Sequence, residues 1–235
     1  MKRFIIAGAI FLANILNANA AVINHDAVVP FAQQNAVNGE QRSALTFRPY
    51  LWIQNGCAPF PSVDAAGNVG GGLKPSGGSS NGCSNSTGQV YVRSAWYRGV
   101  WAIMYSWYWP KDEPSPGIGH RHDWENVIVW INNPEASVQT VLGVSASEHS
   151  GYAKHLGAEV ASSNRHPLIK YDSKWPMDHA LFFTDVVGSM SQPLIHWNQL
   201  TDAARYTLNN YDYGSANVPF KDNNFWNNLA KGWYQ

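Results

Sequence analysis

The stretch QVYVRSAWYRGVWAIMYSWYW (89–109) constrains the fold more than any other part of the chain. It is crowded with aromatic and β-branched residues, which favour the pleated, half-buried surface of a β-sheet. Arg98-Gly99 interrupts it, so the stretch predicts two strands with a break at that dipeptide. A second run, HDWENVIVWI (122–131), ends at Asn132-Asn133-Pro134 and predicts a further buried strand.

The rest of the chain predicts a mainly β protein. Further strands are expected at TFRPYLWIQ (46–54), SVQTVLGVSAS (137–147), LIKYD (168–172) and HALFFT (179–184). Short helices are expected at GEQRSAL (39–45), at TDAARYTLNN (201–210) with Thr201 as its N-cap, and at NNFWNNLAKGW (223–233). The segment PKDEPSPGIG (110–119) has turn composition. The order predicts a single-domain β-sandwich flanked by a few short helices.

The N-terminus has the features of a secretory signal. Lys2 and Arg3 precede the apolar run Phe4–Ile15, and Ala18-Asn19-Ala20 supplies the small residues that signal peptidase requires. We therefore predict a signal peptide at residues 1–20, a mature domain at residues 21–235, and secretion to the extracellular space. No later stretch has the roughly 18 consecutive apolar residues of a membrane-spanning helix.

The charge of the mature chain limits its partners. Loss of residues 1–20 removes two of the 16 basic side chains and none of the 16 acidic ones, so the net charge is near −2. That balance argues against nucleic acid as a partner and against a purely electrostatic hold on anionic lipid. If the protein binds a membrane, as a peripheral protein, it must recognise something more specific than charge.

The chain has two cysteines, Cys57 and Cys83. In an oxidising compartment they predict one disulfide across a surface loop rich in glycine and serine. The entropy lost by the unfolded chain suggests that such a crosslink contributes about 3–4 kcal/mol to stability.

The heptapeptide GHRHDWE (119–125) concentrates side chains that can bind ligands. Strand alternation places Asp123 and Glu125 on one face, where two carboxylates repel each other unless a positive charge lies between them. His120 follows a glycine that lets the chain bend, and Asp112 lies in the proline-rich segment just upstream, so both could approach the same point. These four side chains are candidate ligands for Ca²⁺, Mg²⁺ or Mn²⁺, because oxygen-rich sites favour these ions over zinc.

Two other interpretations of the heptapeptide stay open at this point. The polar residues could form a hydrogen-bond network at a strand end, or the carboxylates could be an acid–base pair of a hydrolase. His122 faces away from Asp123 and is expected to be a structural hydrogen-bonding group, while Arg121 could neutralise excess negative charge. A serine nucleophile is not supported, because the chain has no Gly-x-Ser-x-Gly motif.

The heptapeptide and the preceding AIMYSWYWPKDEPSPGI resemble the signature region of the necrosis- and ethylene-inducing peptide 1-like proteins, which are secreted cytolysins. Other segments resemble the family as well: NHDAVVPF (24–31), the NGC…GGLKPSG…GCS loop, YRGVWAIMYSWY (97–108) and YGSANVPFKDNNF (213–225). Two cysteines are typical of the family's commonest type, which carries one disulfide. The resemblance covers essentially the whole mature chain.

The resemblance implies a fold and a site. Its members have a β-sandwich similar to actinoporins and fungal lectins, and they bind calcium or magnesium in an acidic cavity. The matching ligands here are Asp112, His120, Asp123 and Glu125. The implied target is the sugar head of glycosylinositol phosphorylceramide, a plant sphingolipid, and the implied outcome is membrane leakage without catalytic turnover. A metal-dependent hydrolase and a non-toxic sugar-binding relative are the alternatives.

The resemblance also implies contacts outside the heptapeptide. SKWPMDHAL (173–181) matches a second region, in which Trp175 would lie near the membrane and Asp178 and His179 beside the head-group pocket. Ala102–Arg121 resembles a peptide pattern that some plant immune receptors recognise. The chain has Glu113 where many relatives carry a small residue, and this extra charge could tighten a cation or attract Lys111.

Overall fold

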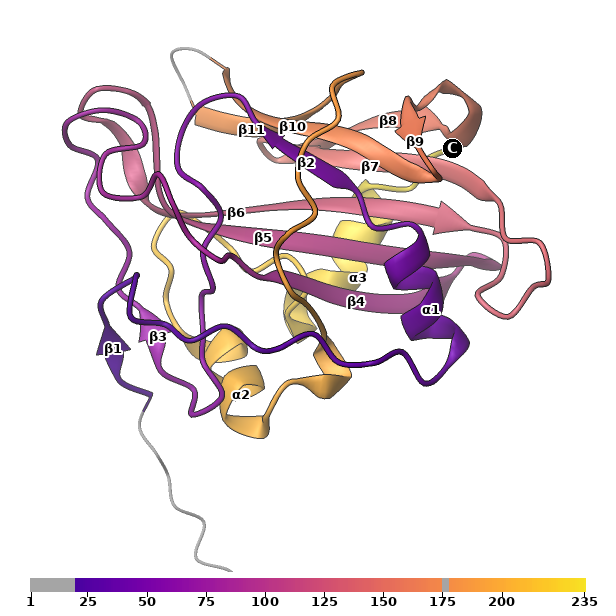
Figure 1. The fold of residues 1–235 in the computed structure, drawn as a ribbon, viewed down its shortest axis with the longest axis horizontal. Coiled ribbons are helices and arrows are strands. Elements are labelled where there is room, and N and C mark those ends of the chain that lie inside the picture. Colours follow the sequence, from indigo (N-terminus) through magenta and orange to yellow (C-terminus); the bar gives the residue numbers. More distant parts are fainter. Residues whose placement is uncertain (1–19, 175–177) are drawn as a thin grey trace, which may run out of the picture.

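The computed structural model describes residues 20–174 and 178–235, and its strands form two main sheets that pack as a sandwich (Figure 1). The six-stranded sheet has the order β12 (Leu194–His196), β4 (Val90–Tyr97), β5 (Val100–Ser115), β6 (Ile118–Ile131), β7 (Val141–Glu148) and β8 (Gly151–Leu156). The four-stranded sheet has the path β11 (Asp178–Phe183), β10 (His166–Lys174) and β2 (Tyr50–Ile53), with β9 (Ser162–Ser163) paired to β10. The expected mainly β sandwich is therefore confirmed.

Short elements complete the fold. Strands β1 (Val22–Ile23) and β3 (Val69–Gly70) form a small parallel pair. The helices are α1 (Gly39–Thr46), α2 (Asp202–Asn210) and α3 (Asp222–Lys231), with 3₁₀ turns η1 (Gly157–Glu159) and η2 (Trp197–Gln199). Helices α2 and α3 lie on the side of the six-stranded sheet away from the four-stranded sheet (Figure 1).

The alternation of β5 and β6 builds a core on both faces of the larger sheet. On one face the fully buried Trp109 stacks on Tyr171 of the smaller sheet, with ring centroids 4.0 Å apart. On the other face Trp124 packs against Phe220, with centroids 5.6 Å apart, beneath the C-terminal segment. Both sides of these strands are therefore buried, which explains their nearly continuous apolar and aromatic composition.

The β5–β6 hairpin shows where the sequence patterns succeed and where they fail. The break at Arg98-Gly99 is confirmed, and both residues have left-handed backbone (φ 49° and 82°). The turn expected over residues 110–119 is wrong, because β5 continues to Ser115 and β6 begins at Ile118. Pro110 is tolerated because the β5–β6 register gives it no partner, so its missing N–H leaves no ladder hydrogen bond unmade. Its carbonyl accepts a hydrogen bond from the Leu73 N–H, outside the sheet.

Other boundaries differ by a few residues. The strand expected at residues 46–54 is shorter, because α1 continues to Thr46 and β2 begins at Tyr50. The N-cap of α2 is confirmed, since the Thr201 side chain accepts a hydrogen bond from the Ala204 N–H. The Cys57–Cys83 disulfide is also confirmed. The loop between the two cysteines was expected to lie at the surface, but part of it is buried.

The buried part of that loop is formed by apolar side chains that the composition did not reveal. Val63 and Val69 have no exposed surface, and Val69 belongs to β3. The glycine-rich composition masked this anchor, because two valines among many glycines give no periodic signal.

Two expectations fall outside the described residues. The predicted signal peptide lies in residues 1–19 apart from its last residue, and Trp175 belongs to the short undescribed segment 175–177. Within the described ranges, no helix has the length and apolar character needed to cross a bilayer.

His196 of β12 gives a prediction for stability against acid. It is buried, neither ring nitrogen has a hydrogen-bond partner in the described chain, and burial lowers its pKa to about 4. His196 in the unfolded chain takes up a proton near pH 6.5, whereas His196 in the native state stays neutral until about pH 4. The free energy of unfolding therefore falls as the pH is lowered from about 6.5 to 4. The full loss is about 3 kcal/mol.

Urea unfolding at several pH values checks this prediction. The raised pKa values of buried carboxyl groups act in the opposite direction, so the comparison is with a His196→Gln variant. We expect the variant to lose less stability than the wild type below pH 6.5. Parallel profiles for the two proteins would show that His196 does not titrate differently on folding.

Candidate functional site

The structure brings most of the sequence-predicted site residues into one cavity of about 370 Å³, which we call the acidic cavity. Its lining includes Asp112 from β5, His120, Asp123 and Glu125 from β6, and Asp178 and His179 from β11. The remaining walls come from the β7–β8 turn, residues 215–219 and the end of α3.

The acidic cavity forms where β6 is no longer paired with β7. Pairing of β6 with β7 extends only as far as Val127 and Ala146, because β7 soon turns back into β8. The part of β6 that precedes Val127 therefore has an edge that β7 does not cover. Asp123 and Glu125 lie along this edge, and both are on the same face, as strand alternation predicts.

Asp123 and Glu125 are held as buried carboxyl groups. Asp123 accepts a hydrogen bond from the Tyr171 hydroxyl (2.8 Å), and Glu125 accepts one from the Ser147 hydroxyl. Burial raises the pKa of Asp123, and the nearby Asp112 raises it further. Burial and the neighbouring Asp123 raise the pKa of Glu125 well above its usual range. A positive ion beside them would relieve this strain.

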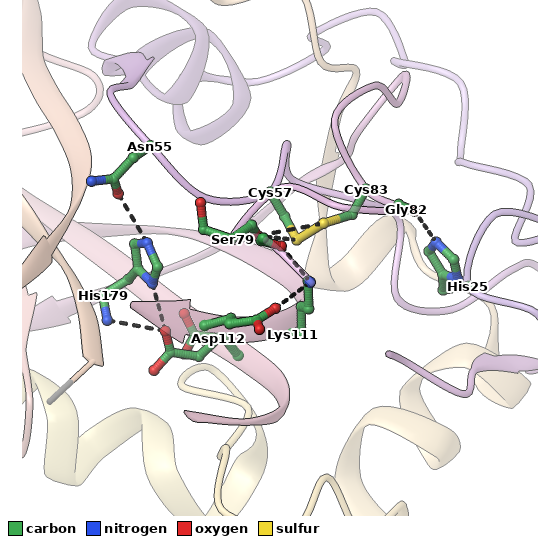
Figure 2. The surroundings of a disulfide bond; sticks show 12 residues. His25, Asn55, Cys57, Ser79, Gly82, Cys83, Lys111, Asp112 and His179 are labelled. Carbon is green, nitrogen blue, oxygen red and sulfur yellow. Dashed lines mark hydrogen bonds and ion pairs between the residues drawn. A yellow bond between two sulfur atoms is a disulfide. The ribbon is translucent and has the colours of Figure 1, made fainter. Parts of the chain in front are cut away.

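Asp112 is fixed by His179. Its Oδ1 accepts a hydrogen bond from the His179 backbone N–H (3.2 Å) and lies 2.5 Å from the ring Nδ1 (Figure 2). The other oxygen, Oδ2, faces His120 at 3.7 Å. These contacts leave Oδ2 as the oxygen of Asp112 that is free to meet a ligand.

Asn55 supports His179 from the far side, and sequence reasoning missed it. The His179 Nε2 lies 2.9 Å from Asn55 Oδ1, as Figure 2 shows. The amide cannot be flipped, because its nitrogen donates to Asp172 and its oxygen accepts from the Ser173 N–H. A possible signal was its place beside Gly56-Cys57, where the disulfide fixes the loop.

Gly56 lets that loop approach. Its φ is 87°, and a Cβ there would lie 2.9 Å from His179 Nε2 and 3.0 Å from the Tyr171 ring. A side chain would therefore clash with the same two residues that support the carboxylates.

His120 is oriented in the way that metal-binding histidines often are. Its Nδ1 lies 2.7 Å from the His122 carbonyl oxygen, so Nδ1–H donates and Nε2 is the free nitrogen. His122 has left-handed backbone (φ 62°), which interrupts strand alternation between the hairpin tip and Asp123. This kink is how Asp112 and His120 reach a cavity that also contains Asp123.

His122 and Arg121 support the hairpin from outside the carboxylate cluster. The His122 ring contacts Tyr108, whose hydroxyl lies 2.6 Å from Nδ1, and burial lowers the pKa of His122 to about 4. The Arg121 guanidinium donates to the carbonyls of Gly71 and Gly72 (2.6 and 2.9 Å). Arg121 therefore ties the disulfide loop to the hairpin; the expected neutralising contact with a carboxylate is not among the ion pairs of the described residues.

Glu113 is turned away from the acidic cavity. It forms a buried ion pair with Lys111, which also donates to the carbonyls of Ser76 and Gly78 in the disulfide loop. Burial raises the pKa of Glu113, but hydrogen bonds from the Gly117 N–H and from Lys111 outweigh it, so the net pKa is lowered. Of the two possibilities that the sequence left open, the structure shows the attraction of Lys111.

Asp178 contributes an unsatisfied oxygen. Its Oδ2 lies 2.6 Å from His149 Nδ1, whereas the buried Oδ1 has no hydrogen-bond partner in the described chain. Within residues 20–174 and 178–235, no three His, Cys, Asp or Glu side chains form a ready-made cluster for one ion. The carboxyl groups that repel each other, the free Nε2 of His120 and the orphan oxygen nevertheless suit a hard cation that keeps part of its water.

Solved structures define the class of protein. One, described as "NLPPya in complex with mannosamine", is 50% identical to this chain, covers 92% of it and 100% of its own length, and has a TM-score of 0.86. Another, described as "Toxin fold as basis for microbial attack and plant defense", is 49% identical with coverages of 91% and 100% and a TM-score of 0.86. A third, "non-toxic HaNLP3 protein", is 44% identical with coverages of 90% and 99% and a TM-score of 0.87. The protein therefore has a toxin fold.

Sequence relatives define the family. The family description "Necrosis inducing protein (NPP1)" matches residues 41–232. "NLP effector protein 10" of Phytophthora capsici is 52% identical over 100% of this chain and 99% of its own length. "Necrosis-inducing protein NPP1" of Phytophthora nicotianae is 49% identical over 98% of each chain. The chain belongs to the necrosis-inducing protein (NPP1) family, and its curated relatives are described as effectors and necrosis-inducing proteins, not as enzymes.

Proposed function

We propose that this protein is a secreted, divalent-cation-dependent cytolysin that binds the sugar head of glycosylinositol phosphorylceramide and permeabilises the plant plasma membrane. The observation that carries the proposal is the acidic cavity, where Asp112, Asp123 and Glu125 are buried together in a protein with a toxin fold. Buried carboxylates that repel each other are unstable alone and suit a cation.

Asp112, His120, Asp123 and Glu125 are the residues that would hold Ca²⁺ or Mg²⁺. The cation would supply coordination sites for sugar hydroxyls. Tyr171, Ser147 and His179 orient the carboxyl groups, and the backbone carbonyl of His122 orients the His120 ring. This arrangement provides selectivity without net positive charge, in agreement with the nearly neutral composition.

A sugar ligand is supported by the size of the cavity and by a relative. Ligand pockets in proteins are typically about 300–1,000 Å³, and the acidic cavity falls in this range. A solved relative is described as a complex with mannosamine. We therefore propose that this protein also binds a sugar.

Membrane contact is assigned to the region around Asp178 and His179. Both line the acidic cavity and follow directly on the segment that contains Trp175. An interfacial tryptophan suits this role, because its ring is amphipathic. One such side chain supplies only about 1.5–3 kcal/mol, so shallow attachment helped by several lipid contacts is the proposed mode.

Dye leakage from plant plasma-membrane vesicles tests the proposal. We expect leakage in the presence of added calcium or magnesium and a loss of at least tenfold with excess chelator, because the carboxylates then lack their counter-charge. Vesicles made only of phosphatidylcholine are the control for sugar recognition. Equal leakage with and without chelator would contradict a cation-dependent mechanism.

The second candidate function is a non-cytolytic sugar binder that hosts recognise as an immune pattern. It is favoured by the similarity to a structure described as non-toxic, which matches this fold as well as the toxin structures do. Binding of the head-group sugar without leakage would identify this case. A receptor for Ala102–Arg121 would require release of the segment, because residues 102–113 are buried in the sheet.

A further inference from the structure

The acidic cavity has two chemically different sides. Because it extends across the uncovered edge of β6, it meets both faces of that strand: Asp123 and Glu125 on one face, Trp124 and Asn126 on the other. The acidic side continues to β11. The other side is built by residues 215–219 and by α3, which ends at Lys231.

Lys231 is the only lysine or arginine among the described residues that line the cavity. Its ammonium group makes one weak contact, with the Ser150 carbonyl oxygen at 3.4 Å. The contacts of the lining carboxylates with basic side chains go to His120, His149 and His179. Within the described chain, Lys231 therefore presents a positive charge to the cavity that no carboxylate neutralises.

Trp124 lines the same cavity and carries a neutral hydrogen-bond donor. The Trp124 indole N–H is buried without a hydrogen-bond partner in the described residues. An unpaired buried donor costs about 1–3 kcal/mol, so an acceptor at this side would be stabilising. Asn217 adds an amide that forms no side-chain hydrogen bond within the described residues, while the Asn228 amide already donates to Pro219.

We propose that this side of the acidic cavity, centred on Lys231, is a subsite for an anionic group on the sugar ligand. The inference rests on the proposed sugar-binding function and adds a specificity-determining residue to it. The chemistry is that of anionic oxygens, either a sugar carboxylate or a phosphate ester. A ligand with hydroxyls at one end and such a group at the other would contact both sides of the cavity.

Calorimetric titration with soluble sugars in the presence of calcium tests the subsite. The probes are glucosamine, glucose, glucuronate and myo-inositol 1-phosphate, so the last two separate a carboxylate from a phosphate ester. We expect wild-type protein to bind at least one anionic probe more tightly than glucose. Lys231→Gln should weaken that probe about 5- to 10-fold and change glucose affinity less than twofold, as expected for loss of one charged contact.

Lys154→Gln is the matched control, because Lys154 is an exposed lysine of β8 outside the cavity lining. If both substitutions weaken the anionic probe equally, the effect comes from the overall charge of the protein and the proposed subsite is overturned. Unchanged affinity in Lys231→Gln would overturn it too, while calcium-dependent glucose binding would leave the proposed function standing. Failure of wild-type protein to bind any of the sugars would overturn both proposals.

Discussion

Asp123→Asn is expected to stabilise the cation-free protein at neutral pH while it abolishes calcium-dependent leakage. The residue is 7% exposed, and burial together with Asp112 raises the pKa of its carboxyl group, so the ionised form destabilises the native state. Asparagine has nearly the same shape and can still accept the Tyr171 hydrogen bond. Removal of the charge should add about 2 kcal/mol to the free energy of unfolding at pH 7.

The sign of the pH dependence follows from the raised pKa. The native state keeps its proton on Asp123 at a pH where the unfolded chain, with an ordinary pKa near 4, has lost it. Wild-type stability therefore falls as pH rises above about 4 through the folded pKa. The advantage of Asp123→Asn should be absent near pH 4 and grow toward neutrality, as measured by urea unfolding in the presence of chelator.

A matched control separates this effect from general charge removal. Asp185→Asn changes an exposed carboxylate in the loop after β11, so stability and leakage should both stay near wild type. Calcium should raise the melting temperature of wild-type protein and leave that of Asp123→Asn almost unchanged, because ligands stabilise only the state that binds them. An Asp123→Asn protein that unfolds more easily at pH 7, or that still causes calcium-dependent leakage, would contradict this account.

The parts of the site that sequence could predict depend on local periodicity. Asp123 and Glu125 share a face because strand side chains alternate, and this is independent of the rest of the fold. Thr201 caps α2 because the capping interaction spans only three residues. Such features need no knowledge of which strands pair.

The parts that sequence could not predict depend on contacts between distant segments. Asn55 precedes Asp112 by 57 positions, and Tyr171 follows it by 59. Both residues reach the site because β2 pairs with β10. The left-handed backbone at His122 could not be predicted locally, because this conformation is uncommon in any residue other than glycine and no neighbouring residue pattern requires it. Pro110 suggested a turn, and only the long β5–β6 pairing overrides that preference.

Trp109→Ala is expected to give the largest loss of stability among the changes considered. The side chain has no exposed surface and stacks on Tyr171, whose ring in turn stacks on His179 with centroids 4.7 Å apart. Truncation of a buried tryptophan costs about 3–5 kcal/mol. For a chain of this length the melting temperature should fall by about 10 °C.

The aromatic stack connects this loss to the site. Tyr171 both packs on Trp109 and donates to Asp123, so a cavity at position 109 should loosen the carboxyl group as well as the core. Trp109→Phe is the control: it keeps an aromatic face for Tyr171 and removes an indole N–H that has no partner in the described chain, so it should cost no more than about 1–2 kcal/mol.

Thermal unfolding and calcium titration at 15 °C, where both variants are folded, separate packing from binding. We expect Trp109→Ala to bind calcium more weakly than Trp109→Phe, since only the former frees Tyr171. Equal affinities alongside unequal melting temperatures would show that the stack supports the core alone. A melting temperature for Trp109→Ala close to wild type would mean that the two sheets do not depend on this contact.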